Sequence, residues 1–313
     1  MKHAFMIATL LVAALSISFV KPHTAVAQKG TRVQTTLYGG VGKGPPDRGT
    51  IITINQSSAL GTLLGAGASD PNVGITGLAF DTSGQLFAST INASVDVPGA
   101  RTLLIRLDPI TGLQVASIGT IKLANNAPII ITDLAIQPDT DQLFGLRINP
   151  ADFSTSLYRI NSSTAIATLV GPTDTEVDAI AFAPDGTLYG EAAIFDDTGV
   201  NFLHGSLITM DPATGGTLTS AGQFLTHLGG MAIRPTDGVI FASGGGGGDM
   251  YTLSSTGDLT FLGVTGFGGA GDIAFTPIPT NKDQCKDDGW QRFNFPFSFK
   301  SQGDCIQFVN TGK

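Results

Sequence analysis

The sequence contains little charge, few histidines and almost no cysteine. Only 13% of its 313 residues are Asp, Glu, Lys or Arg, and the chain has 4 His, 2 Cys and 1 Trp. So few charges together with 41 Gly exclude a disordered acidic chain and disfavour a helical bundle or coiled coil. The formal net charge of -8 argues against nucleic acid and anionic membranes as partners, since both bind clustered Lys and Arg. The composition therefore favours a large β-rich globular protein.

The first 27 residues have the pattern of a secretory signal peptide. A basic start is followed by an apolar run from Ala4 to Val20 and by the small-x-small motif Ala25-Val26-Ala27. We expect cleavage before Gln28 and a secreted protein, extracellular or periplasmic, with no membrane insertion afterwards. The length of the apolar run leaves an uncleaved anchor as the alternative.

The two cysteines, Cys285 and Cys305, both lie near the C-terminus. In an exported protein they are expected to form a disulfide, which would stabilise this segment by about 3 kcal/mol. A zinc site at these sulfurs is disfavoured because no His stands beside them.

Two short patterns recur five times between residues 28 and 280. The first is an apolar residue, Ala, then Phe or Ile, and its copies are 42 to 56 residues apart. It occurs at Leu78-Ala79-Phe80, Leu134-Ala135-Ile136, Ile180-Ala181-Phe182, Met231-Ala232-Ile233 and Ile273-Ala274-Phe275. The second joins an apolar residue, an aromatic residue and Gly or Ala, at Leu37-Tyr38-Gly39, Leu86-Phe87-Ala88, Leu143-Phe144-Gly145, Leu188-Tyr189-Gly190 and Ile240-Phe241-Ala242.

These repeats predict an all-β, five-bladed β-propeller. Each unit supplies four short strands separated by turn residues, and its period is typical of propeller blades. The first copy of the second pattern, at Leu37, precedes any copy of the first, and the last copy of the first, at Ile273, stands alone. We therefore expect N- and C-terminal strands to pair and close the ring. Six blades would require four strands inside an insert such as Asn92 to Arg101 or Ile121 to Ile131, which is too short.

The stretches Leu78 to Phe87 and Ile180 to Gly190 approximate L-A-F-x-P-D-G-x-L-Y-G. In these residues the chain resembles a loose group of secreted bacterial β-propeller repeat proteins. The resemblance covers about Thr36 to Pro277. It implies the propeller fold and no particular activity.

Residues 281–313 differ in composition and are predicted to form a separate small module. They contain both Cys and the only Trp, Trp290, and resemble a short two-Cys tail found on diverse secreted bacterial proteins, for which no activity is assigned. The alternation of Phe293, Phe295, Phe297 and Phe299 predicts a strand that packs on Trp290 or on the propeller. A role in surface attachment or partner docking is the alternative.

Motifs of catalysis are missing from the sequence. It has no G-x-S-x-G, H-E-x-x-H or P-loop motif, and the glycine-rich segments Gly39 to Gly44 and Gly244 to Gly248 are interpreted as loops. His204 and His227 are interpreted as solvated loop histidines. These features predict a protein that is not an enzyme and needs no cofactor, with calcium as the one ion left open.

One set of acidic residues is not explained by turns. Asp133 and Asp272 directly precede the apolar-Ala pattern, and Asp178 lies one position earlier in its repeat. Propeller geometry would bring them to one mouth of the central channel, together with Glu176, where they would favour a cation or a hydroxyl-rich ligand. The alternative is that each carboxylate bonds its own loop or a neighbouring blade.

The sequence thus predicts a secreted, non-enzymatic binding module for an unknown protein, a glycan or a cation. A carbohydrate-active hydrolase and a structural component of the cell envelope are the alternatives. The hydrolase would require two carboxylates about 5 to 9.5 Å apart in an open pocket.

Overall fold

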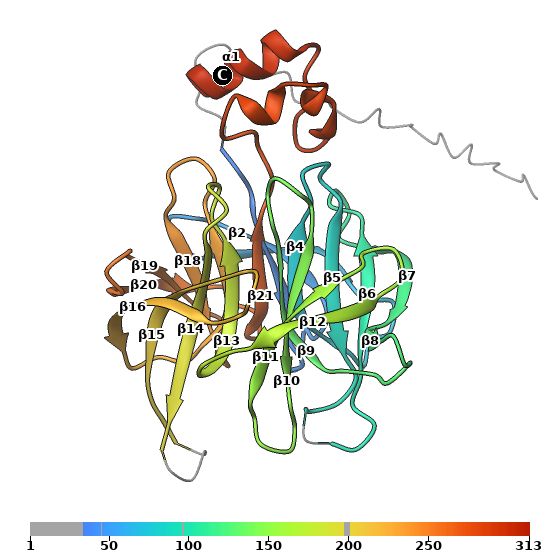
Figure 1. Ribbon diagram of the computed structural model, residues 1–313, viewed down its shortest axis with the longest axis vertical. Coiled ribbons are helices and arrows are strands. Elements are labelled where there is room, and N and C mark those ends of the chain that lie inside the picture. The colour runs from blue at the N-terminus through green and yellow to red at the C-terminus, as the bar shows by residue number, and fades with distance from the viewer. Residues whose placement is uncertain (1–33, 45, 96, 197–200) are drawn as a thin grey trace, which may run out of the picture.

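The computed structural model describes residues 34–313 apart from 45, 96 and 197–200, so the predicted signal peptide lies outside the described residues. Five β-sheets are arranged in a ring, whose central axis is here called the channel, and a small helical module lies beyond one end of it (Figure 1). Within the described residues, no helix has the length and apolarity needed to cross a membrane.

The five sheets are the blades of a propeller, and each is antiparallel with four strands in ladder order. Blade 1 contains β21 (Ala270–Phe275), β1 (Leu37–Val41), β2 (Ile51–Ile54) and β3 (Gly61–Gly65). Blade 2 contains β4 (Gly74–Phe80), β5 (Leu86–Ile91), β6 (Thr102–Leu107) and β7 (Gln114–Thr120). Blade 3 contains β9 (Ile131–Ile136), β10 (Leu143–Ile148), β11 (Thr155–Ile160) and β12 (Ile166–Pro172), to which β8 (Lys122–Leu123) adds in parallel. Blade 4 contains β13 (Glu176–Phe182), β14 (Leu188–Phe195), β15 (Phe202–Met210) and β16 (Thr217–Phe224). Blade 5 contains β17 (Leu228–Ile233), β18 (Ile240–Gly244), β19 (Asp249–Leu253) and β20 (Leu259–Val264).

Blade 1 joins the two ends of the propeller. Strand β21 pairs antiparallel with β1, with Leu37 opposite Phe275 and Gly39 opposite Ile273. Both the predicted closure and the predicted count of five blades are therefore confirmed.

The first repeated pattern forms the innermost strands β4, β9, β13, β17 and β21. In β4, Leu78, Ala79 and Phe80 are all buried, so both faces of the strand are covered, as in sheets packed between neighbouring layers. Gly77 shows how closely these strands approach, because a Cβ there would lie 2.6 Å from the Leu134 Cγ of the next blade. Small residues at this level allow five strands to surround a narrow channel.

Each innermost strand carries a β-bulge at the same level. The bulged residue is skipped in the pairing with the second strand of its blade, and these residues are Thr76, Thr132, Asp178, Gly229 and Gly271. A bulge changes the direction of a side chain relative to the regular pleat. Asp178 is the only acidic residue among these five bulged residues, so only the bulge of blade 4 redirects a carboxylate.

The C-terminal module is helical. It consists of two short 3-10 helices, η1 (Asp283–Cys285) and η2 (Gly289–Arg292), and of α1 (Gln302–Thr311). The predicted disulfide between Cys285 and Cys305 is present, a bond typical of proteins outside the cytoplasm. The Ser301 side chain caps α1 by accepting from the Asp304 N–H at 3.2 Å.

The predicted strand of alternating phenylalanines is wrong. Phe299 packs against Phe293 and Phe308, with ring centroids 6.1 and 5.3 Å apart, so these rings form a small core beside the disulfide. Pro296 stands within the alternating segment and has no N–H to donate to a ladder, which disfavours a strand. Phe295 instead stacks on Phe80 of the propeller at 6.2 Å.

The module covers the end of the channel where the innermost strands finish. Arg292 forms an ion pair with Asp141, and Gln284 Nε2 donates to Asp139 at 3.3 Å. A cavity of about 130 Å³ lies beneath it, lined by the ends of the innermost strands and by Ile278 and Gln284. The other end of the channel, where these strands begin, is not covered by the module (Figure 1).

Candidate functional site

The four acidic residues singled out in the sequence separate into two groups. Asp133 and Asp272 are fully buried within the channel, whereas Asp178 and Glu176 lie nearer its uncovered mouth and are partly exposed. The register confirms the sequence comparison: Asp133 and Asp272 occupy equivalent paired positions, and Asp178 is the bulged residue one position earlier.

Asp133 and Asp272 bond the backbone of neighbouring blades. Asp133 Oδ2 accepts from the Ile180 N–H at 2.6 Å, and Asp272 Oδ2 accepts from the Leu78 N–H at 2.5 Å. Each carboxyl group also accepts from the N–H of the residue that follows it, at 2.9 and 2.6 Å respectively. These contacts match the structural alternative that the sequence left open for this pair.

Asp133 and Asp272 also hydrogen bond to each other, which requires a shared proton. Burial raises the pKa of Asp272 to about 8 and the pKa of Asp133 well above its usual range; for Asp133 the nearby Asp272 charge adds to the effect. The pair therefore ties blades together across the channel, with its oxygens engaged by protein donors.

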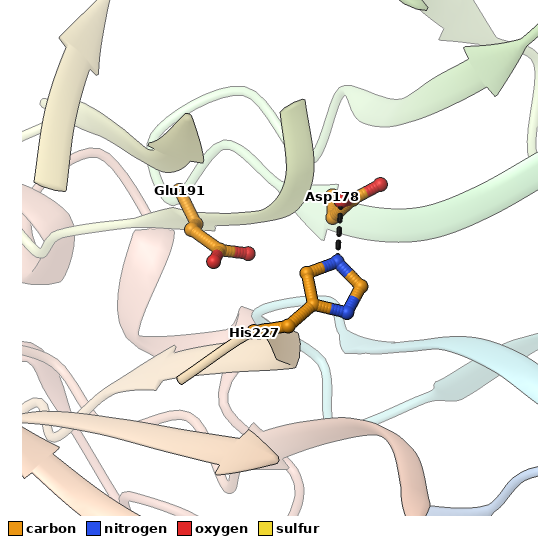
Figure 2. A group of neighbouring side chains, drawn as sticks. All are labelled: Asp178, Glu191 and His227. Carbon is orange, nitrogen blue, oxygen red and sulfur yellow. Dashed lines mark hydrogen bonds and ion pairs between the residues drawn. The ribbon is translucent and has the colours of Figure 1, made fainter. Parts of the chain in front are cut away.

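Asp178, Glu191 and His227 form a second group, here named the mouth cluster (Figure 2). Asp178 comes from the bulge of β13, Glu191 from the adjacent β14, and His227 from the loop that precedes β17 of the next blade. His227 Nε2 and Asp178 Oδ2 are 2.6 Å apart, and one ligand-type atom from each of the three side chains lies within 4.8 Å of the others.

Glu191 is the buried member of the mouth cluster. Its Oε1 accepts from the Leu228 N–H at 3.2 Å, whereas Oε2 has no hydrogen-bond partner among the described residues although the side chain is 0% exposed. Burial first, and the Asp178 charge second, raise its pKa to about 8. The register-equivalent residues of the other blades do not ionise: Gly40, Ser89, Leu146 and Ser243.

Glu176 extends the cluster toward solvent. It begins β13 and is partly buried, and burial together with the Asp178 charge raises its pKa to about 7, with His227 acting in the opposite direction. Glu176 is thus close enough to Asp178 and His227 to feel their charges, and its role in binding a ligand stays a prediction.

His227 differs from the solvated loop histidine that the sequence predicted. Its side chain is 39% exposed, but the hydrogen bond with Asp178 raises its pKa against the opposing effect of burial. Its ring also contacts Phe195 and Phe202, with centroids 6.0 and 5.3 Å apart. The glycine-rich loop approaches it closely, since a Cβ at Gly245 would lie 2.7 Å from Nδ1.

His204 does not belong to the mouth cluster, so the two histidines do not form a common site. Its Nε2 lies 3.4 Å from Gln223 Nε2. Residues 178, 191 and 227 come from two blades and share no spaced motif, so sequence reasoning did not place Glu191 and His227 beside Asp178. The one available signal was Glu191 itself, an acidic residue within an otherwise apolar strand pattern.

Two carboxylates and an imidazole are able to bind a cation or to accept hydrogen bonds from hydroxyl groups. The imidazole makes the donor set different from the all-oxygen sites that calcium prefers. One ligand oxygen of Asp178 and one of Glu191 lie within 4.8 Å of each other, which is near the lower end of the separation of about 5 to 9.5 Å between glycosidase carboxyl groups.

No protein-family model and no curated protein matches this sequence. Solved structures with a similar fold include one of a nidogen/laminin complex, at 13% identity and a TM-score of 0.47 over 75% of this chain and 80% of that chain. A PQQ-bound aldose sugar dehydrogenase from Streptomyces coelicolor has 16% identity and a TM-score of 0.45 over 78% and 87% of the two chains. A protein of unknown function from Dyadobacter fermentans has 10% identity and a TM-score of 0.47 over 74% and 82%. Similarities this distant transfer no activity or ligand, and the description of the fold rests on the sheet pairing.

Proposed function

We propose that this chain is a secreted, non-enzymatic binding propeller that holds a hydroxyl-rich ligand, an oligosaccharide, at the uncovered mouth of its channel. The observation that carries the proposal is the convergence of carboxyl groups, an imidazole and aromatic rings at this mouth. Glu176, Asp178 and His227 are partly exposed there, and Phe195 and Phe202 pack around His227.

The chemistry of these groups suits a neutral polyhydroxyl ligand. Carboxylate oxygens accept hydrogen bonds from hydroxyl groups, and aromatic rings supply the apolar surface that ligand sites combine with a few polar groups. Phe195 and Phe202 are both partly exposed. The formal charge of -8 disfavours an anionic ligand.

The position of the C-terminal module supports the same mouth. The module lies over the opposite end of the channel, where its contacts with Phe80, Asp139 and Asp141 hold it. A ligand that uses the channel therefore has the end with Glu176 and Asp178 available to it.

A carbohydrate-active hydrolase is the second candidate. It is favoured by the raised pKa of Glu191 beside Asp178, because a protonated acid next to a second carboxylate is the pairing that glycoside hydrolysis uses. The complete burial of Glu191 weighs against it, because a general acid must reach the glycosidic oxygen of the substrate.

The test is an oligosaccharide array probed with the purified chain and with the variants Glu176→Gln and Phe202→Ala. We expect the parent to bind at least one oligosaccharide and each variant to bind it at least tenfold more weakly. Phe261→Ala is the matched control, because Phe261 is a 58% exposed ring on the outer strand β20. Failure of the parent to bind, or equal binding by all variants, would contradict the proposal. Release of reducing ends from the bound sugar would instead identify the hydrolase.

A further inference from the structure

We infer that Asp178, Glu191 and His227 form a site for one divalent cation of the zinc class. The inference deepens the proposed function and rests on it in one respect, since it places the cation at the mouth proposed to bind the oligosaccharide. The three side chains supply two carboxylate oxygens and one imidazole nitrogen, which are common zinc ligands.

The distances are close to those that a bound cation requires. Tetrahedral zinc with bonds of about 2.0 to 2.2 Å holds its ligand atoms roughly 3.3 to 3.6 Å apart. Here Asp178 Oδ2 and His227 Nε2 are 2.6 Å apart, and all three ligand atoms lie within 4.8 Å. Small side-chain rotations would widen the first pair and draw in Glu191, with the cation replacing the hydrogen bond between Asp178 and His227.

Glu191 supplies the independent observation that points to a ligand. Asp178 and His227 satisfy each other by a hydrogen bond and need no cation to do so. That hydrogen bond does not explain why the Glu191 carboxyl group is fully buried beside them. Glu191 Oε2 has no partner among the described residues and belongs to the carboxyl group that lies toward Asp178 and His227 in Figure 2. An unpartnered buried carboxyl oxygen is costly, and a cation would satisfy it.

The surrounding backbone leaves room for the three ligands and fixes their positions. A Cβ at Gly205 would lie 2.7 Å from Glu191 Oε1, and one at Gly245 would lie 2.7 Å from His227 Nδ1. The Gly245 N–H donates to the His227 carbonyl at 2.9 Å. Glycines therefore stand at the two positions where a side chain would displace a ligand, which is the preorganisation that a metal site needs.

The donor set selects the class of cation. Calcium prefers six to eight oxygen ligands, whereas this cluster offers three protein ligands and one of them is nitrogen. Imidazole with carboxylates suits zinc and its neighbours among the transition metals. Three protein ligands leave a fourth position, and the partial exposure of His227 and Asp178 opens it to water or to a ligand hydroxyl.

The experiment is calorimetric titration of the metal-stripped full chain with zinc chloride and, separately, with calcium chloride. We expect one zinc ion per chain, no comparable calcium binding, and a loss of zinc affinity of at least tenfold in Glu191→Gln, which preserves the shape of the side chain. Asp178→Asn tests the same site at a partly exposed position if the buried change prevents folding. The control His204→Gln should bind zinc like the parent, because His204 stands outside the cluster.

The outcomes separate this inference from the proposed function. Unchanged zinc binding in both cluster variants, or calcium binding without zinc binding, would overturn the inference. If zinc does not bind while oligosaccharide binds in the presence of EDTA, the cation site is wrong and the proposed function stands. If zinc binds as expected and no oligosaccharide does, the cation site stands and the proposed function is wrong.

Discussion

Asp133 and Asp272 hydrogen bond to each other inside the channel, and each accepts backbone N–H donors from its own blade and from a neighbouring one. This pair links β9 and β21, two innermost strands that lie far apart in the sequence. The bulge one position earlier carries Asp178 in blade 4, where the same repeat contributes to the mouth cluster instead. One position of the repeat thus carries the buried pair that stabilises the propeller, and the position before it carries Asp178 of the candidate site.

Asp272→Ala is expected to destabilise the propeller by about 2 to 6 kcal/mol, because two buried N–H groups lose their acceptor at about 1 to 3 kcal/mol each. The free energy of unfolding in urea measures the effect. Asp185→Ala is the control, since Asp185 lies in an exposed turn and accepts from the Thr187 N–H. An equal loss of unfolding free energy in the two variants would show that the buried pair stabilises the propeller no more than an exposed turn residue does.

Stability should depend on pH through the same pair. The pKa of Asp272 is raised to about 8 in the folded protein and is about 3.9 when unfolded, so the folded state binds the extra proton between these values. The stabilisation is fully present below about pH 4 and is lost as the pH rises toward 8, at up to about 1.4 kcal/mol per pH unit. Glu191 and Glu176 act with the same sign, because their pKa values are also raised.

Asp272→Asn isolates the contribution of the pair to that pH dependence. The variant has no titratable group at position 272, so the decline of unfolding free energy with rising pH should become shallower, by the equivalent of about one bound proton between pH 5 and 7. Denaturant unfolding at several pH values measures the slope. A slope equal to that of the parent would contradict the shared proton.

Gly77→Ala should cost about 1 to 3 kcal/mol through overpacking, because the added Cβ would lie 2.6 Å from Leu134 Cγ and from Ser89 Oγ. Gly44→Ala is the control, since nothing lies within 4 Å of a Cβ there. Thermal unfolding of both variants measures the difference. Similar transition temperatures for both would show that the innermost strands are less tightly packed than described.

Replacing Cys285 and Cys305 by Ser should loosen the C-terminal module and leave the propeller folded. The disulfide joins residues with a sequence separation of 20, and a loop of that size stabilises its segment by about 3 kcal/mol. Hydrogen exchange should lose protection in α1 while the innermost strands keep theirs. Loss of protection throughout the chain would mean that the module supports the whole propeller.

The fold was predictable from the sequence because each blade repeats the same two patterns, and the lone copies at Leu37 and Ile273 indicated how the ring closes. The disulfide of the module was predicted correctly, but the strand predicted at Phe293 to Phe299 was wrong, because Pro296 and the disulfide favour a compact cluster of rings over a strand. At the site, the repeat located Asp178 and Glu176. Glu191 and His227 escaped notice because their proximity to Asp178 depends on packing between blades.

We propose that the mouth cluster is the ligand site of this propeller. Anomalous diffraction at the zinc edge, from crystals of the chain grown with zinc, tests it most directly. We expect one peak about 2.0 to 2.2 Å from an oxygen of Asp178, an oxygen of Glu191 and a nitrogen of His227. A cluster without a peak, in crystals where zinc binds elsewhere on the chain, would contradict it.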